Sequence, residues 1–96
     1  MEDFIYYNNL YDYYKELLTD KQREYFEDYY QNNLTLSEMA DNYQVSRNAI
    51  HKQLKETVKL LESYELKLNL YDKMNKIFNL VKNDQKLLNE IERIIG

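Results

Sequence analysis

Residues 34–54 read LTLSEMADNYQVSRNAIHKQL, and this stretch predicts a short helix, a tight turn and a second helix. Ser37 and Ser46 each stand where a side-chain oxygen can accept a hydrogen bond from a free amide in the first turn of a helix. Apolar residues at helical spacing predict that the two helices pack together, with Val45 pointing inward from the turn. They are Met39, Ala40, Tyr43, Ile50 and Leu54. The pattern is typical of a helix-turn-helix over about 36–55, in which the small Ala40 lets the helices cross closely.

The second helix of this motif exposes side chains that can bond base edges or phosphates. The residues expected at such an interface are Ser46, Arg47, Asn48, His51, Lys52, Lys55 and Lys59. Many such motifs carry Gly in the turn, where the backbone can need a positive φ, and here Gln44 occupies that place. The competing interpretation is a helical hairpin buried in a bundle, without contact to nucleic acid.

The composition predicts a single all-α domain over residues 1–96. The chain has no Pro and a single Gly, at its C-terminus, and its apolar residues recur at helical spacing. Without Cys there is no disulfide and no thiolate metal site, and we expect no cofactor. The acidic N-terminus is unlike a signal peptide, and no apolar run approaches the ~20 residues that span a bilayer. We therefore expect a cytoplasmic protein without membrane insertion.

The charge is unevenly distributed along a chain whose net charge is −4. The first 31 residues are strongly acidic, whereas basic side chains gather on the second helix of the motif. DNA-binding domains are usually basic throughout, because counterion release drives their affinity. Any affinity for nucleic acid should therefore be modest and strongly dependent on salt.

Outside the motif, the sequence predicts four further helices and an extension of the motif's second helix. An N-terminal pair covers about 3–18 and 20–31, with Thr19 and Gln22 forming a capping box between them. The motif's second helix should run on to about Leu68 and end at Asn69. A helical extension over about 69–96 follows, with one helix over 71–81 and a last helix capped by Asn83 or Asp84. The numerous tyrosines at helical spacing are interpreted as core residues with hydrated hydroxyls rather than as base-stacking platforms.

Two helices carry apolar stripes, one expected to join the core and one expected to need a packing partner. The N-terminal stripe is Phe4, Tyr7, Leu10, Tyr11, Tyr14, Leu17 and Leu18, and the C-terminal stripe is Leu87, Leu88, Ile91, Ile94 and Ile95. The second stripe is too apolar to be left in water. Its helix should fold back onto the long helix or form an oligomer interface.

Catalysis finds little support in the sequence. His51 is the only histidine, and no Cys, Asp or Glu stands at the spacing of a catalytic relay or a metal pair. A phosphate-binding loop needs several glycines, which the chain lacks. We therefore expect that the protein is not an enzyme.

Several segments together resemble the YlxM family of low-GC bacteria. They are LLTDKQR over 17–23, Tyr29-Tyr30, LSEMA over 36–40, VSRNAI over 45–50 and LLESYELKL over 60–68. The central motif is also similar to region 4 of bacterial sigma factors. The resemblance implies an all-helical fold and a regulatory or accessory role in the signal recognition particle pathway. The pair His51-Lys52 and the apolar Val58 depart from the family pattern. The pair makes the helix more basic and favours nucleic acid, whereas Val58 widens the apolar stripe and favours a partner helix.

Two functions from different classes remain. The first is binding to DNA or to the RNA of the targeting particle through the motif's second helix. The second is a protein-interaction role, in which the long helix and the C-terminal helices bind the targeting GTPase or a second copy of the chain.

Overall fold

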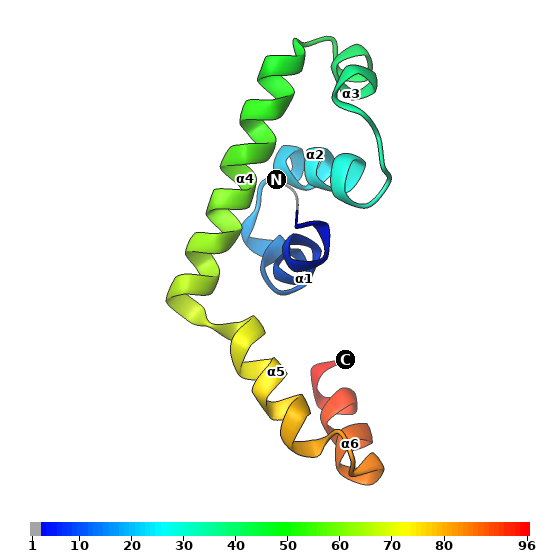
Figure 1. Cartoon of the computed structure of the whole chain (residues 1–96), viewed down its shortest axis with the longest axis vertical. Coiled ribbons are helices and arrows are strands. Elements are labelled where there is room, and N and C mark those ends of the chain that lie inside the picture. Colours follow the sequence, from blue (N-terminus) through cyan, green and yellow to red (C-terminus); the bar gives the residue numbers. More distant parts are fainter. Residues whose placement is uncertain (1–2) are drawn as a thin grey trace.

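The computed structural model describes residues 3–96, which form six α-helices and one short 3-10 helix and contain no strand. The bounds are α1 Phe4–Tyr14, the 3-10 helix η1 Lys15–Leu17, α2 Asp20–Tyr30, α3 Leu36–Tyr43, α4 Arg47–Leu68, α5 Leu70–Val81 and α6 Gln85–Ile95. In Figure 1, α4 runs along one side of α1, α2 and α3, and α5 and α6 continue beyond its C-terminal end. The all-α prediction is confirmed. Met1 and Glu2, part of the acidic N-terminus, lie outside the described residues.

The first helix ends earlier than its apolar stripe predicts. After Tyr14 the chain tightens into η1, and Leu18 then takes an extended conformation. A 3-10 helix has three residues per turn instead of 3.6, so the stripe loses its phase there. Leu18 is buried, but Leu17 is 53% exposed. The prediction that Leu17 belongs to the core is therefore wrong.

Side-chain caps mark the starts of the helices that follow. Thr19 and Gln22 form the predicted capping box of α2, and the Ser46 hydroxyl accepts from the Ala49 amide at the start of α4. The prediction that Ser37 caps the first motif helix is wrong. Thr35 holds that position, because Glu38 three residues later bonds back to the Thr35 amide and completes a second capping box. Ser37 is left exposed within the first turn of α3.

The turn of the motif is built on Gln44, whose φ is 57° and ψ is 45°. In this left-handed conformation the Val45 amide reaches back to the Ala40 carbonyl, at 3.1 Å. This bond closes the C-terminus of α3 in the manner of a Schellman motif. The same reversal turns Val45 outward, with 41% of its surface exposed. The expectation that Val45 points inward is therefore wrong.

The core lies between α4 and the three helices that precede it. Its fully buried side chains include Leu10, Tyr14, Phe26, Met39, Ile50, Leu54 and Leu61. Tyrosine hydroxyls at its edge are hydrogen-bonded, as Tyr11 is to Glu27 and Tyr14 is to Glu65. The core role predicted for these tyrosines is confirmed, but these two hydroxyls bond to carboxylates and are not hydrated as predicted. Val58 is also buried, so the apolar residue that widens the stripe packs within this chain instead of serving a partner.

Helix α4 is the longest element, with 22 residues, and is unbroken as predicted. It begins after its Ser46 cap and ends at Asn69, whose φ of 54° gives the expected left-handed C-terminus. At 1.5 Å per residue it is about 33 Å long. Its buried stripe reaches only as far as Glu65, because Leu68 is 43% exposed.

A buried carboxylate joins α4 to α5. Glu65 is 8% exposed and accepts hydrogen bonds from the amides of Tyr71 and Asp72 and from the Tyr14 hydroxyl. The Tyr14 oxygen in turn accepts from the Leu70 amide, at 3.0 Å. Asn69 makes no side-chain cap, so Glu65 and Tyr14 satisfy the amides that the first turn of α5 leaves free. We call Tyr14, Glu65 and the start of α5 the helix joint.

Helices α5 and α6 form a C-terminal hairpin. Asp84 caps α6 by accepting from the Leu87 amide, as predicted, and α6 then runs back beside α5 (Figure 1). Neither helix contains a buried residue. The last helix therefore folds back onto α5 and not onto α4. Within residues 3–96, no helix is both long and apolar enough to cross a membrane.

Candidate nucleic-acid interface

Helix α3, which packs against the start of α4, is itself held in place by contacts with α2. The Tyr43 hydroxyl of α3 donates to the Asp28 carboxylate of α2, and the pKa of Tyr43 is raised by burial and by this bond. The Lys21 ammonium lies 5.4 Å from the Tyr25 ring centre and 5.3 Å from that of Tyr43. Helix α3 thus rests on α2 while it packs against α4, with Met39 and Ala40 buried. This arrangement fixes the motif from behind and leaves the outer side of α4 open.

All seven residues predicted at the interface lie in or before the first four turns of α4, and all are exposed. Ser46 is engaged by its cap bond, whereas the other six side chains extend from the helix. Asn48, Lys52, Lys55 and Lys59 fall within about 60° around the helix axis, at 100° per residue. They form an outer row, opposite the buried stripe that contains Ile50 and Leu54.

Arg47 and His51 lie beside this row, on the edge that faces α3. Together with Ser46, Asn48 and Leu36 of α3 they line a shallow hollow of about 610 Å³. The structure thus brings the outer row and the α3-facing edge onto one continuous part of the surface. Leu36, which sequence reasoning treated as part of the motif only, joins the predicted residues there.

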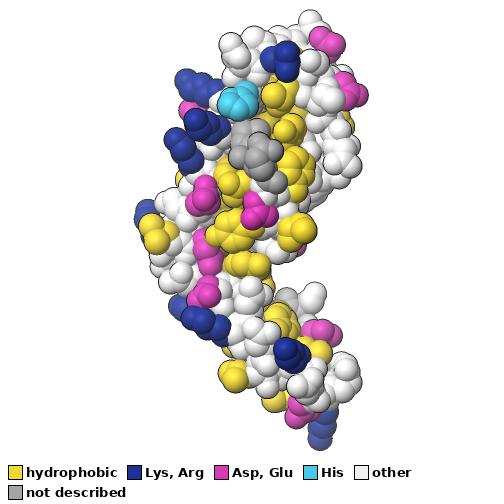
Figure 2. Space-filling model, in the orientation of Figure 1, with side chains coloured by type: hydrophobic (Ala, Val, Ile, Leu, Met, Phe, Trp, Pro, Cys, Tyr) yellow, Lys and Arg dark blue, Asp and Glu magenta, His cyan; other side chains and the backbone are white. Residues whose placement is uncertain are grey.

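The cations of this surface form no ion pair with any residue that the structure describes. Residues 47–59 carry Arg47, Lys52, Lys55 and Lys59 but only one carboxylate, Glu56. Among residues 3–96, the side-chain ion pairs are Arg23–Asp20 and Lys76–Asp72, and neither involves this helix segment. Figure 2 shows the histidine, in cyan, beside several dark blue Lys and Arg groups toward the upper end of the molecule. A chain with a net charge of −4 therefore presents a local cationic surface.

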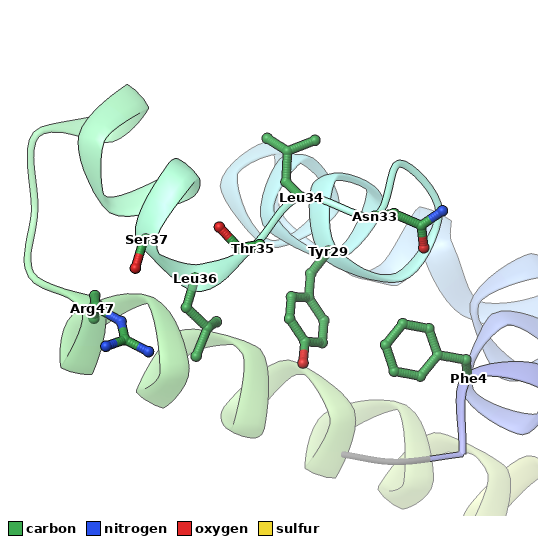
Figure 3. Close-up of a pocket in the computed structure, with 8 residues that line it drawn as sticks. All are labelled: Phe4, Tyr29, Asn33, Leu34, Thr35, Leu36, Ser37 and Arg47. Carbon is green, nitrogen blue, oxygen red and sulfur yellow. The ribbon is translucent and has the colours of Figure 1, made fainter.

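Sequence reasoning missed a second hollow, which adjoins the first at Leu36 and Arg47. It measures about 320 Å³ and is lined by Phe4, Tyr29, Asn33, Leu34, Thr35, Leu36, Ser37 and Arg47 (Figure 3). We call it the aromatic pocket. Its walls come from α1, α2, the α2–α3 loop, α3 and α4, so no local pattern in the sequence could have assembled it. The only local signal is the pair Asn32-Asn33, of which Asn33 takes a φ of 58° and turns the loop around the pocket.

The part of the chain that the structure describes contains no group of three or more His, Cys, Asp or Glu side chains that could hold a metal ion. His51 is exposed on α4. The groups that the motif presents at its surface are cationic, amide, hydroxyl and imidazole side chains, which can donate hydrogen bonds and attract phosphates.

The comparison with protein families finds a match over residues 1–95, to the family described as "Putative helix-turn-helix protein, YlxM / p13 like". Among curated proteins, the chain is 47% identical over 75 residues to a UPF0122 protein of Oceanobacillus iheyensis, covering 78% of this chain and 71% of that protein. It is 42% identical over 89 residues to a UPF0122 protein of Staphylococcus epidermidis, covering 86% and 81%. A UPF0122 protein of Bacillus mycoides is 42% identical over 87 residues, covering 91% and 79%.

Proposed function

Because the chain belongs to the YlxM/p13-like helix-turn-helix family, we propose that it is a regulatory protein that binds nucleic acid through α3 and α4. The observation that carries this proposal is the exposed cationic surface on the first half of α4, whose charges have no ion-pair partner in residues 3–96. Unpaired Lys and Arg groups gain most from phosphates, because they lose no existing ion pair and release counterions from the nucleic acid.

Each proposed contact residue has a role that follows from its place. Asn48, at the start of the outer row, and Arg47 and His51, on the α3-facing edge, are placed to reach base edges in a groove. Lys52, Lys55 and Lys59 continue the outer row and are placed to meet phosphates. Ser46 fixes the start of α4 through its cap bond and thereby the direction in which these side chains point.

The proposed ligands are DNA and the RNA of the signal recognition particle. The second follows from the family resemblance, which implies an accessory role in co-translational targeting. We propose that the protein is cytoplasmic and is not an enzyme, as the sequence predicts.

Binding measured by fluorescence anisotropy at about 50 and 200 mM salt tests the proposal on duplex DNA and on the targeting-particle RNA. We expect binding at low salt that weakens steeply at the higher concentration, because phosphate contacts dominate. Lys55→Ala should weaken binding to all sequences and flatten the salt dependence, by removing one phosphate contact. Lys73→Ala, which removes an exposed lysine of α5, is the matched control and should bind like the parent. Absence of binding at 50 mM salt would refute the proposal.

A second candidate function is supported by the C-terminal hairpin. Leu80 is 85% exposed and Ile94 is 84% exposed, and neither helix of the hairpin contains a buried residue. Exposed apolar faces of this kind mark protein interfaces. In this alternative, the hairpin and the long helix bind the targeting GTPase or a second copy of the chain. Capture of the purified GTPase by the parent, and its loss with Ile94→Glu, would support the first of these partners.

A further inference from the structure

The aromatic pocket combines the chemical groups that recognise a nucleobase joined to a phosphate. Phe4 and Tyr29 supply ring faces, with their centroids 5.5 Å apart and their planes inclined by 41°. Both side chains are half-buried and line the pocket, and each ring also makes a T-shaped contact with the Tyr30 ring. Figure 3 shows the Phe4 and Tyr29 rings and the Leu36 side chain directed toward one space, with Arg47 at its far side.

Polar groups stand around these rings. The Ser37 hydroxyl and the Asn33 amide make no hydrogen bond with any residue in 3–96, and the Arg47 guanidinium makes neither a hydrogen bond nor an ion pair there. Thr35 and Glu38, by contrast, are occupied in the capping box. The pocket thus keeps donors and an acceptor for the edge of a base and a cation for its phosphate. Its volume of about 320 Å³ is at the small end of ligand pockets, which span ~300–1,000 Å³.

From this combination we infer that the aromatic pocket receives one unstacked base of a nucleic-acid strand whose paired region lies along α4. The inference rests on the proposed function and deepens it, by naming a duplex with a bulged or unpaired nucleotide as the ligand. A base inside a duplex offers no free ring face, so only an unstacked base can use Phe4 and Tyr29. The apolar side chain of a protein partner could contact the rings, but it would leave Arg47 without a counter-charge.

The aromatic pocket is continuous with the cationic surface of α4. Leu36 and Arg47 line both the aromatic pocket and the hollow at the start of α4. A sugar-phosphate backbone that contacts Lys59, Lys55 and Lys52 in turn therefore reaches the mouth of the aromatic pocket at the start of α4. Arg47 stands between the two and can hold the phosphate that links the paired region to the unstacked base.

The test compares two RNA hairpins that are identical except for one bulged nucleotide, and the corresponding pair of DNA hairpins, by fluorescence anisotropy with the full chain. We expect the parent to bind a bulged hairpin at least about fivefold more tightly than its paired counterpart, the lower end of the effect of stacking one base on a ring. Tyr29→Leu removes a ring and should abolish this preference while leaving the affinity for the paired hairpin. Ser37→Trp should do the same by filling the pocket from an exposed position, without removing a core side chain.

Tyr13→Leu is the matched control, because Tyr13 is also half-buried but packs near Tyr71, away from the pocket. It should keep the preference for the bulged hairpin. Equal affinity of the parent for bulged and paired hairpins would overturn the pocket assignment while leaving the proposed function intact. A preference that survives both Tyr29→Leu and Ser37→Trp would also overturn it.

Two further outcomes distinguish a base within a nucleic-acid strand from a free nucleotide. Failure of every hairpin to bind would overturn the proposed function and the pocket assignment together. AMP and GMP are then titrated into the protein and followed by NMR. Shifts of the Phe4 and Tyr29 ring signals with these nucleotides, without hairpin binding, would reassign the pocket to a free nucleotide and contradict the strand.

Discussion

At Gln44 the backbone adopts a φ of 57°, a conformation in which an L side chain crowds the neighbouring carbonyl at a cost of about 1–2 kcal/mol. Glycine avoids this crowding, but it also increases the conformational entropy of the unfolded chain, which offsets part of the stabilisation. We therefore expect Gln44→Gly to raise the free energy of unfolding by about 0.5–1 kcal/mol, measured by urea denaturation. Gln31→Gly, at a φ of −115°, should bring no gain. Equal responses of the two variants would show that the left-handed turn stores no strain.

Arg47 is the residue shared by the outer surface of the motif and the aromatic pocket. Arg47→Ala should weaken nucleic-acid binding by about 1–3 kcal/mol, through loss of a base or phosphate contact. Because the side chain is exposed and has no ion pair within residues 3–96, the free energy of unfolding should stay within about 0.5 kcal/mol. Anisotropy and urea denaturation measure the two quantities. Arg93→Ala in α6 is the control, and an affinity loss as large as that of Arg47→Ala would argue for a non-specific charge effect.

At the scale of the elements, the helix joint decides how α5 leaves α4. Glu65→Ala would leave the Tyr71 and Asp72 amides and the Tyr14 hydroxyl without their acceptor. We expect a loss of about 2–4 kcal/mol in the free energy of unfolding, since hydrogen bonds to a charged group are the stronger kind. Hydrogen exchange at the Tyr71 and Asp72 amides should accelerate. Glu62→Ala, three residues earlier and exposed, should change neither, and slow exchange in Glu65→Ala would mean that the joint has another anchor.

The helix joint also has a pH dependence. Burial, together with the hydrogen bond to Glu65, raises the pKa of Tyr14 to about 12, from an ordinary 10.0. The folded protein thus keeps this proton where the unfolded chain loses it. The contribution of protonated Tyr14 to the free energy of unfolding is complete below pH 10. It is lost as the pH rises toward 12, and the free energy of unfolding then falls by about 1.4 kcal/mol per pH unit. Thermal unfolding between pH 9 and 12 should show this fall, and Tyr14→Phe should show a shallower one from a lower starting stability. Parallel curves would exclude Tyr14 as a contributor.

At the scale of the whole molecule, the chain measures 50 × 25 × 22 Å, and its C-terminal hairpin carries exposed apolar side chains. We expect self-association through this hairpin at micromolar concentration, measured by sedimentation. Ile94→Glu should shift the population to monomer, because a charge cannot be buried there without a partner. Ile5→Glu, which changes a 79% exposed residue on α1, is the control. A clean monomer for the parent would mean that packing of α6 on α5 suffices.

The sequence predicted what depends on neighbouring residues. Ser46, the pair Thr19 and Gln22, and Asp84 cap their helices as expected, because a cap involves residues only three apart. The inward orientation predicted for Val45 was wrong because Gln44, the residue before it, is left-handed and changes the direction of the chain. The prediction failed again at the aromatic pocket, where Phe4 and Arg47 belong to different helices. Such long-range placement depends on how all the helices pack, which no local pattern contains.

The unbroken α4 also sets a separation. Its hydrogen-bonded backbone resists bending, so it acts as a stiff spacer of about 33 Å between the motif and the helix joint. The motif and the C-terminal hairpin, the two surfaces proposed to bind ligands, are therefore held apart by the length of this helix. If both proposed surfaces were occupied, the chain would act as a bridge that raises the local concentration of one bound molecule around the other.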